Sequence, residues 1–163
     1  MTSPGNGWKS IRGIEHQPRL RLFLAGMANV SKHLGRKSVL SARQIARPRL
    51  ILDTFSNPNP GRDYEIELIF PEFTSVCPVT GQPDFATITI KYVPEKKCLE
   101  MKSLKLYFLA FRNKGMFFEA AVNSILDDLT WATDPRSITV EGKFAVRGGM
   151  SAVVTASGPE IPF

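Results

Sequence analysis

Apolar side chains occupy every second position in two segments near the middle of the chain. Residues 64–70 alternate aromatic or aliphatic side chains with polar ones, and residues 85–93 alternate again with many β-branched side chains. A period of two predicts half-buried β-strands. Turn-forming residues at 56–61 precede the first strand, and we expect a loop over 71–83 to join it to the second.

The spacing changes to three and four residues between positions 99 and 132. This spacing is typical of amphipathic helices, and it predicts one helix over 99–111 and another over 117–132, before Asp134-Pro135. The expected buried positions are Leu104, Phe108 and Phe111 on the first helix, and Phe118, Val122, Ile125 and Leu129 on the second.

A second pair of alternating segments follows the helices, at 137–144 and 150–155, joined by Arg147-Gly148-Gly149. The order ββααββ predicts an α+β fold, with an antiparallel four-stranded sheet and both helices on one face. Such a sheet has two exposed edges, and neighbouring subunits can close them. We therefore expect an oligomer.

The net charge of +6 divides unevenly along the 163 residues. Residues 1–50 contain ten of the Lys and Arg residues and one acid, whereas residues 51–163 carry a net charge of −3. We therefore interpret 1–50 as a basic N-terminal extension and 51–163 as one folded domain without a general basic surface. No apolar run approaches the roughly 20 residues that span a bilayer, so we expect a cytoplasmic protein that does not enter the membrane.

Three hypotheses account for the basic extension. Translation can start later, for example at Met27; the segment can be a disordered arm that contacts RNA through phosphate charge; or it can be a transit peptide. The sequence alone leaves all three open.

Both histidines, His16 and His33, lie in this extension. The predicted domain therefore lacks the side chain needed for a His-ligated zinc ion, a Ser-His-Asp triad or a Cys-His pair. Its two cysteines, Cys77 and Cys98, have no metal-binding or C-x-x-C spacing, so we expect free thiols and no metal.

Cys77 lies in the predicted loop between the first two strands, among several prolines. A loop restricted by proline can present a nucleophile, and Asp84, seven residues on, is the nearest candidate partner for the thiol. Cysteine is also among the residues most often buried for structural reasons, so both interpretations of Cys77 stay open here.

The run PEFTSVCPVTGQPDF (71–85) resembles the active-site segment of the NADPH-dependent 7-cyano-7-deazaguanine reductases of queuosine biosynthesis. The resemblance covers roughly residues 51–155 and continues through 100–107, 111–113, 134–136 and 147–149. It implies a tunnelling fold, in which ββααββ subunits form rings with active sites between subunits.

The resemblance also implies a role for each of several residues. Cys77 would capture the substrate nitrile as a covalent thioimide, and Asp84 would donate a proton to the nitrile nitrogen. Two NADPH would then convert 7-cyano-7-deazaguanine to 7-aminomethyl-7-deazaguanine. The implied substrate-binding residues are Leu99, Glu100, Met101, Phe118 and Glu119, and the implied cofactor-binding residues are Lys102, Lys105 and Arg147. No G-x-G-x-x-G occurs, so we expect an NADPH site that is not of the Rossmann kind.

The sequence departs from the family pattern beside the expected base-recognising Glu119. Phe118 stands where the family usually has histidine, and phenylalanine can neither donate, accept nor titrate. We therefore expect weaker substrate positioning or slower reduction. Met101 and Ala121 also differ from the usual residues, and we assign Cys98 no role.

Two other functions remain open from the sequence. The resemblance extends to an amidine-forming transferase, in which the same cysteine would capture the nitrile on tRNA and ammonia would be added without NADPH. A non-catalytic module that binds deazaguanine or RNA is the third hypothesis.

Overall fold

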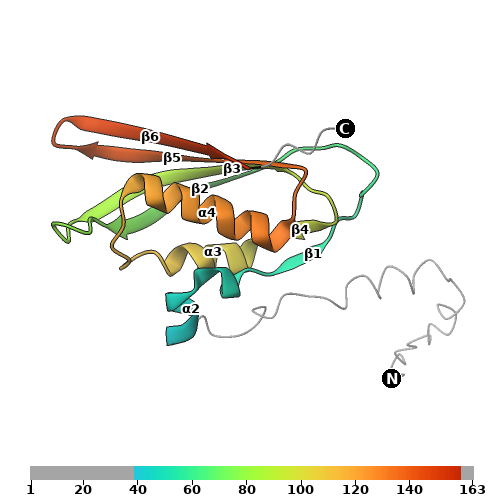
Figure 1. Cartoon of the computed structure of the whole chain (residues 1–163), viewed down its shortest axis with the longest axis horizontal. Coiled ribbons are helices and arrows are strands. Elements are labelled where there is room, and N and C mark those ends of the chain that lie inside the picture. Colours follow the sequence, from blue (N-terminus) through green and yellow to red (C-terminus); the bar gives the residue numbers. More distant parts are fainter. Residues whose placement is uncertain (1–38, 159–163) are drawn as a thin grey trace, which may run out of the picture.

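Four long antiparallel strands form the main sheet (Figure 1). The computed structural model describes residues 39–158. The strands are β2 (Ile66–Val76), β3 (Pro83–Val93), β5 (Ser137–Arg147) and β6 (Met150–Ser157), in the spatial order β2-β3-β5-β6. The predicted antiparallel four-stranded sheet is confirmed.

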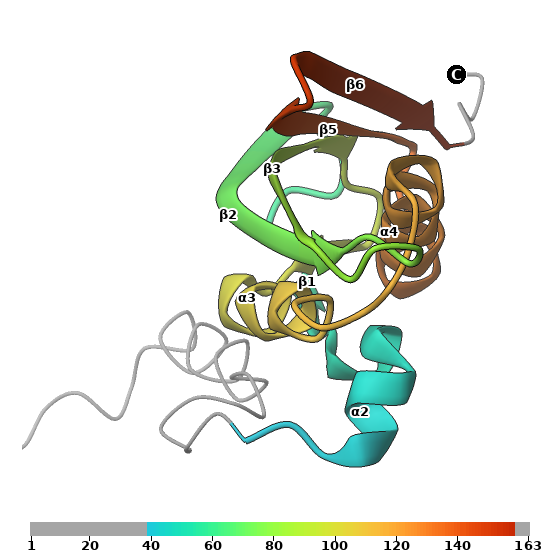
Figure 2. The ribbon, with the colours of Figure 1, turned by 90° about the vertical axis from the view of Figure 1, so that its left-hand side faces the viewer.

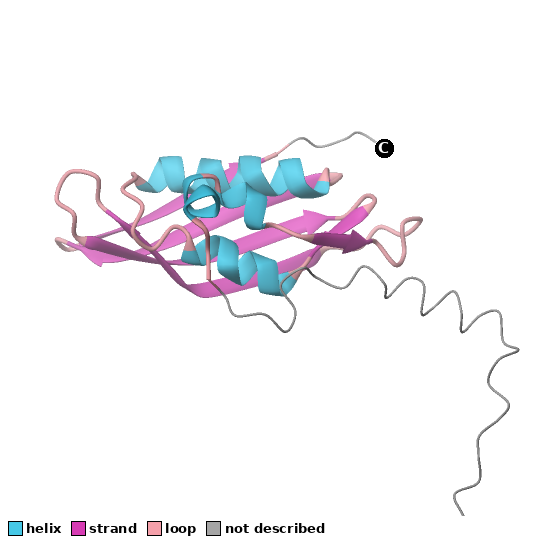
Figure 3. Ribbon diagram, turned by 90° about the horizontal axis from the view of Figure 1, so that it is seen from below, coloured by secondary structure: helices cyan, strands magenta, loops and turns pink. Residues whose placement is uncertain are grey.

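Two helices, α3 (Met101–Leu109) and α4 (Phe118–Thr133), cover one face of this sheet (Figures 2 and 3). The order of the long elements is ββααββ, as predicted. The expected helical stripes are buried, except that Phe118 is half-buried. Residues of the core include Ile88, Ile90, Tyr107, Phe108, Phe111, Val122, Ile125, Leu129 and Val140.

Local interactions explain where α3 begins and where α4 ends. The Glu100 side chain accepts hydrogen bonds from the backbone N–H groups of Lys102 and Ser103, at 2.9 and 2.8 Å, and so caps α3. Asp134 ends α4 in the left-handed conformation, with φ of 48°, and Pro135 follows it.

Strand β2 is longer than the sequence pattern predicted. The expected loop over 71–83 is wrong for 71–76, which continue the strand and pair with β3 as far as Val76 opposite Pro83. An irregularity in the register between Phe70 and Phe73 accommodates Pro71, which cannot donate a backbone hydrogen bond. The bulge shifts the period-two pattern, which hid the second half of the strand.

A short two-stranded sheet was also missed. Strand β1 (Thr54–Ser56) pairs with β4 (Lys97–Leu99). The first helix was expected from residue 99, but Leu99 belongs to β4, where its N–H donates to the Tyr92 hydroxyl at 3.0 Å. Three-residue strands are too short to show a period.

Helix α2 (Ala42–Ala46) and the 3₁₀-helix η2 (Pro48–Ile51) were not predicted either. They span the proposed boundary at residue 50, and η2 contacts α3 and α4. Most of the basic extension, including both histidines, lies outside the described residues. No helix among the described residues is both long and apolar enough to cross a membrane.

Helix α4 approaches β5 closely at Gly142. A Cβ atom added there would lie 2.8 Å from Val122 Cγ2 and 3.0 Å from a ring carbon of Phe144. Contacts this short are strongly repulsive, so the absence of a side chain at 142 allows the helix to pack on the sheet.

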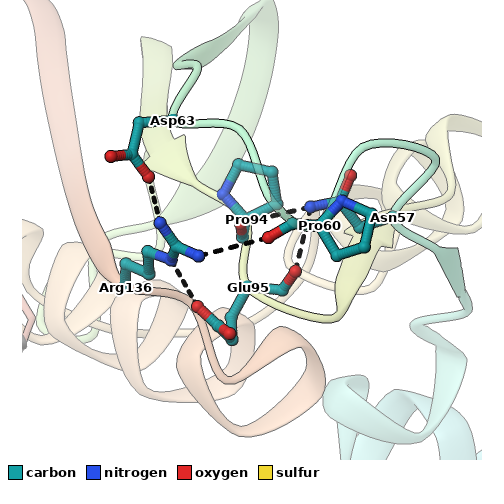
Figure 4. A network of polar contacts seen from close by, with 6 residues as sticks. All are labelled: Asn57, Pro60, Asp63, Pro94, Glu95 and Arg136. Atoms are coloured by element: carbon teal, nitrogen blue, oxygen red, sulfur yellow. Dashed lines mark hydrogen bonds and ion pairs between the residues drawn. The ribbon is translucent and has the colours of Figure 1, made fainter.

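A polar network joins three connections at the end of the molecule that carries β1 and β4 (Figure 4). Arg136 contacts the carboxylates of Asp63 and Glu95 and donates to the Pro60 carbonyl at 3.2 Å. Asn57 donates to the carbonyls of Pro94 and Glu95, at 3.3 and 2.9 Å. These bonds fix the turn before β4 and therefore the backbone that leads to Leu99 and Glu100.

Candidate active site

Cys77 begins the tight turn between β2 and β3. Its N–H donates to the Gln82 carbonyl at 2.8 Å, and its own carbonyl accepts from the Gly81 N–H at 2.9 Å. Gly81 has a φ of 69°, which few other residues adopt without strain. Cys77 is half-buried and unpaired with any other cysteine. The turn thus presents a free thiol on a backbone closed by its own hydrogen bonds.

Asp84 lies on the β3 side of this turn with only 5% of its surface exposed. Arg147, the last residue of β5, reaches over it and donates from Nη1 to Asp84 Oδ1 at 2.6 Å. Arg147 Nη2 donates to Thr80 Oγ1 and to Gln82 Oε1, both at 2.8 Å. One guanidinium therefore neutralises the nearly buried carboxylate and holds two side chains of the Cys77 turn.

The environment of the turn lowers the pKa of the Cys77 thiol to about 7. The largest cause is a hydrogen bond from the Thr80 side chain, followed by the backbone N–H groups of Thr80 and Val79. Arg147 makes a smaller contribution of the same sign, whereas burial acts in the opposite direction. A pKa near 7 leaves a large thiolate fraction at neutral pH, as a cysteine nucleophile requires.

Phe118, the first residue of α4, lies at the end of the molecule that carries Asp84 and Arg147. Its ring stacks on Phe144 of β5, with centroids 3.9 Å apart and planes 14° from parallel. It lines a cavity of about 360 Å³ together with Asp84 and Arg147. The remaining lining residues are Gln82, Pro83, Phe85, Ala145 and Val146.

The structure brings together four of the predicted site residues, namely Cys77, Asp84, Phe118 and Arg147. Glu119 follows Phe118 in the first turn of α4, but its side chain is exposed and does not line this cavity.

The predicted substrate segment Leu99, Glu100 and Met101 lies elsewhere. Leu99 ends β4, Glu100 caps α3 and Met101 is the first residue of α3. The segment after α3 lies instead beside the Cys77 turn, since the Lys114 carbonyl accepts from the N–H of Val76, the residue before Cys77, at 3.1 Å. A nine-residue helix of about 14 Å separates the two regions within one chain (Figure 1). Leu99 is 3% exposed and Glu100 caps α3, whereas Met101 is 58% exposed.

Lys102 and Lys105 lie on α3, whereas Arg147 is the last residue of β5. Lys105 lines a groove of about 760 Å³ with Arg112, over a largely apolar floor that includes Phe70 and Phe108. Phe85 lines both this groove and the cavity beside Asp84. The groove, which Glu72 also lines, therefore adjoins the cavity.

Sequence reasoning missed Thr80 and Gln82 as partners in the site. Both lie between Cys77 and Asp84, but hydroxyl and amide side chains are common in turns for local reasons, so residue type gave no signal. A tight hairpin over 77–82 would have pointed to them, and the loop was expected to be twice as long.

Comparison with known proteins identifies the family. A sequence model described as "QueF-like protein" matches residues 83–161. The NADPH-dependent 7-cyano-7-deazaguanine reductase of Anaeromyxobacter sp. (strain K) is 59% identical over 116 residues, which cover 71% of this chain and 95% of that protein. The chain belongs to the QueF-like family. The family member from Chlorobium phaeovibrioides is 60% identical over 107 residues, 66% of this chain and 92% of its own.

A solved structure supports the same fold. The crystal structure of the archaeosine synthase QueF-Like in the apo form matches with a TM-score of 0.53, covering 61% of this chain and 96% of that one. At a sequence identity of 20%, this match supports a shared fold and nothing about function. The tunnelling fold expected from the resemblance is confirmed for the single subunit.

Proposed function

We propose that the protein reduces the nitrile of 7-cyano-7-deazaguanine to 7-aminomethyl-7-deazaguanine with NADPH, as its relatives' names state for them. The observation that carries the proposal is the joint placement of an activated thiol and a nearly buried carboxylate, Cys77 and Asp84, both tied to Arg147. This arrangement suits capture of an electrophilic carbon.

In the proposed capture step the Cys77 sulfur bonds to the nitrile carbon, and the nitrile nitrogen gains a proton. The thiol loses one proton and the nitrogen gains one, so the step is the addition of S–H across the triple bond. Asp84 is the group beside the turn that can pass this proton. The product is a thioimide on Cys77.

The residues of the groove fit a dinucleotide cofactor. Lys105 and Arg112 supply positive charge for phosphates, and the phenylalanines of the floor supply apolar surface for a ring. When bound, the nicotinamide would supply hydride, and reduction of a nitrile to an amine requires two such transfers. Because Phe85 belongs to both the groove and the cavity, a cofactor in the groove would lie next to the cavity that Asp84 and Phe118 line.

We also propose that the complete site forms between two copies of the chain. Cys77 and the segment 99–101 lie at opposite ends of α3, too far apart for one small base to contact both. The outer strands β2 and β6 each have one edge that is unpaired within the described sheet. Pairing of such edges between subunits would bring the start of one α3 to the Cys77 end of a neighbour.

The direct test is to mix the protein with 7-cyano-7-deazaguanine and NADPH and to follow the absorbance of the reduced cofactor. We expect consumption of two NADPH per aminomethyl product, and none with Cys77→Ala. Cys98→Ala is the matched control, because Cys98 is buried away from the turn.

Intact-mass measurement without NADPH separates the competing functions. The proposal expects a covalent adduct on Cys77 that disappears when NADPH is added. An adduct that persists with NADPH favours the amidine-forming transferase, and substrate binding without an adduct favours the binding module. Either result would overturn the proposed reduction.

A further inference from the structure

The resemblance implies a cofactor contact for Arg147, whereas its guanidinium is bound to Asp84 and to the Cys77 turn. We propose that Arg147 is a positioning residue for nitrile capture, which holds the Asp84 carboxyl in place and stabilises its negative charge once the proton has left. The inference deepens the proposed function, on which it rests for the roles of Cys77 and Asp84.

An irregularity at the end of β5 turns the Arg147 side chain toward Asp84. Phe144 is buried and pairs with Ala86, two residues from Asp84 on β3. Strict alternation after Phe144 would place Val146 on this buried face and Arg147 on the opposite one. The register with β6 instead shifts between Phe144 and Arg147. Val146 is 72% exposed and Arg147 reaches Asp84, as expected of a bulge that re-aims a side chain next to a site.

The contact between Arg147 and Asp84 is short and enclosed on the carboxylate side. Arg147 Nη1 donates to Asp84 Oδ1 at 2.6 Å, and the side chain of Asp84 is 4% exposed. Arg147 Nη2 donates to Thr80 Oγ1 and Gln82 Oε1, both at 2.8 Å. The guanidinium therefore cannot turn away from the carboxylate without breaking these bonds as well.

The same contact leaves one oxygen of Asp84 for chemistry. Within residues 39–158, the Asp84 carboxylate accepts its hydrogen bond from Arg147, and that bond goes to Oδ1. Asp84 also lines the cavity, so Oδ2 is the oxygen that remains to take the proton of the Cys77 thiol and pass it to the nitrile nitrogen. One S–H bond breaks and one N–H bond forms, while Asp84 and Arg147 end the step with the protons with which they began.

A fixed cation beside Asp84 favours the transfer of this proton to the nitrile. The Asp84 carboxyl becomes negative as the proton leaves, and a guanidinium within hydrogen-bond distance stabilises that charge. Because Arg147 is held before the substrate arrives, the step requires no reorganisation of the cation. Arginine has no acceptor and keeps its own protons, so Arg147 acts through Asp84.

The position of Arg147 does not fit the groove proposed for the cofactor. Arg147 lines the cavity with Asp84, whereas the cations that line the groove are Lys105 and Arg112. A phosphate that took the guanidinium from Asp84 would leave a nearly buried carboxylate without its partner, which is costly. We therefore assign Arg147 to the capture step and the two groove cations to the cofactor.

The test is the rate of adduct formation with 7-cyano-7-deazaguanine in the absence of NADPH, followed by intact mass. We expect Arg147→Gln to slow this rate at saturating substrate by about 10- to 100-fold, the effect of losing a hydrogen bond to a charged group. The Kd for NADPH, measured by fluorescence titration, should stay at the wild-type value. A cofactor contact would give the reverse pattern, with weaker NADPH binding and normal adduct formation.

Three further variants make the result specific. Arg147→Lys retains the charge and one donor but not the fork, so its rate should fall between those of the wild type and Arg147→Gln. Gln82→Ala removes one bond to the turn and leaves the Asp84 pair intact, so it should slow the rate less than Arg147→Gln does. Lys143→Gln is the matched control, because it removes a cation of β5 that pairs with Glu141 at 3.3 Å, and it should leave the rate unchanged. Thermal unfolding of each variant reports whether it folds.

A wild-type rate in Arg147→Gln, with or without weaker NADPH binding, would overturn the proposal. Equal slowing in Gln82→Ala would also overturn it, since the order of the turn rather than the charge beside Asp84 would then be the cause. If Arg147→Gln does not fold, the rate of Arg147→Lys decides, and a wild-type rate there would refute the assignment. A wild type that forms no adduct would refute capture at Cys77 itself, and the role of Arg147 with it.

Discussion

Phe118 is the residue at which we expected this chain to depart from the family pattern. The structure gives the side chain two tasks, because it stacks on Phe144 and lines the cavity beside Asp84. A histidine ring could also stack there, and it would add a donor and an acceptor facing the cavity. Phenylalanine supplies only the apolar surface.

We therefore expect Phe118→His to raise kcat/KM for 7-cyano-7-deazaguanine by about 2- to 10-fold, the effect of one net hydrogen bond of ~0.5–1.5 kcal/mol. Steady-state kinetics at saturating NADPH measure it. Phe118→Leu, which is apolar and of similar bulk, is the control and should give no gain. Equal kinetics for the histidine variant and the wild type would show that this position needs no polar group.

At the residue scale, the sequence predicted that Cys77, Asp84, Phe118 and Arg147 belong to the site, but it did not predict the contacts between them. Their identities came from a motif, which preserves residue type and spacing. The contact of Arg147 with Asp84 spans 63 positions and depends on how the β5–β6 turn folds over the β2–β3 turn. Neither periodicity nor composition carries that information.

At the scale of elements, α3 and α4 are joined by a polar contact. The Tyr107 hydroxyl donates to Asp128 Oδ2 at 3.0 Å, and Tyr107 is fully buried. Burial is the largest cause of a raised pKa for both side chains. The hydrogen bond is therefore needed to offset the cost of placing an ionisable pair between the helices.

We expect Tyr107→Phe to lower the free energy of unfolding by ~1 kcal/mol, because the Asp128 carboxylate loses its donor. Urea unfolding at pH 7 measures this change. Asp128→Asn retains an acceptor for Tyr107 and should cost less.

The pH dependence of the asparagine variant is a second measurement on the same contact. Since the pKa of Asp128 is raised in the folded protein, the folded state favours the protonated carboxyl, and this advantage is lost as pH rises through the folded pKa. Asp128→Asn should therefore compare more favourably with the wild type at pH 7 than at pH 4. The opposite trend would contradict the assigned direction.

The long elements were predictable because each buries one face with a regular period. Val122, Ile125 and Leu129 are spaced for one helical stripe, and all three are fully buried. The errors occurred where a period was interrupted or too short. Pro71 lies at the irregularity that divides β2, and β1 and β4 have only three residues each.

At the scale of the whole molecule, the proposed site depends on two copies of the chain. The polar network around Arg136 fixes the turn that leads to the segment 99–101, and the Arg147 contacts fix the Cys77 turn at the other end. Each end is thus rigid by itself. Association of copies would then bring together two surfaces that are already formed.

This arrangement predicts complementation between two inactive variants. Cys77→Ala lacks the nucleophile, and Glu100→Gln lacks a carboxylate in the substrate segment but retains an oxygen that can cap α3. If sites form between subunits, random mixing in one oligomer restores about a quarter of the sites. Co-refolding the two variants and measuring NADPH consumption tests this.

Each variant refolded alone is the control for the mixture. A mixture no more active than its components, with size-exclusion chromatography showing mixed oligomers, would indicate that each site lies within one chain.

The close packing at Gly142 has a consequence for how variation in this protein is interpreted. The atom positions that exclude a side chain there belong to Val122 and Phe144, and Phe144 supports Phe118 in the cavity wall. A side chain introduced at position 142 would displace Phe144 and, with it, the Phe118 ring that stacks on it. A laboratory that selects for a wider range of nitriles is thus expected to recover substitutions at 142 that alter selectivity, although Gly142 does not line the cavity.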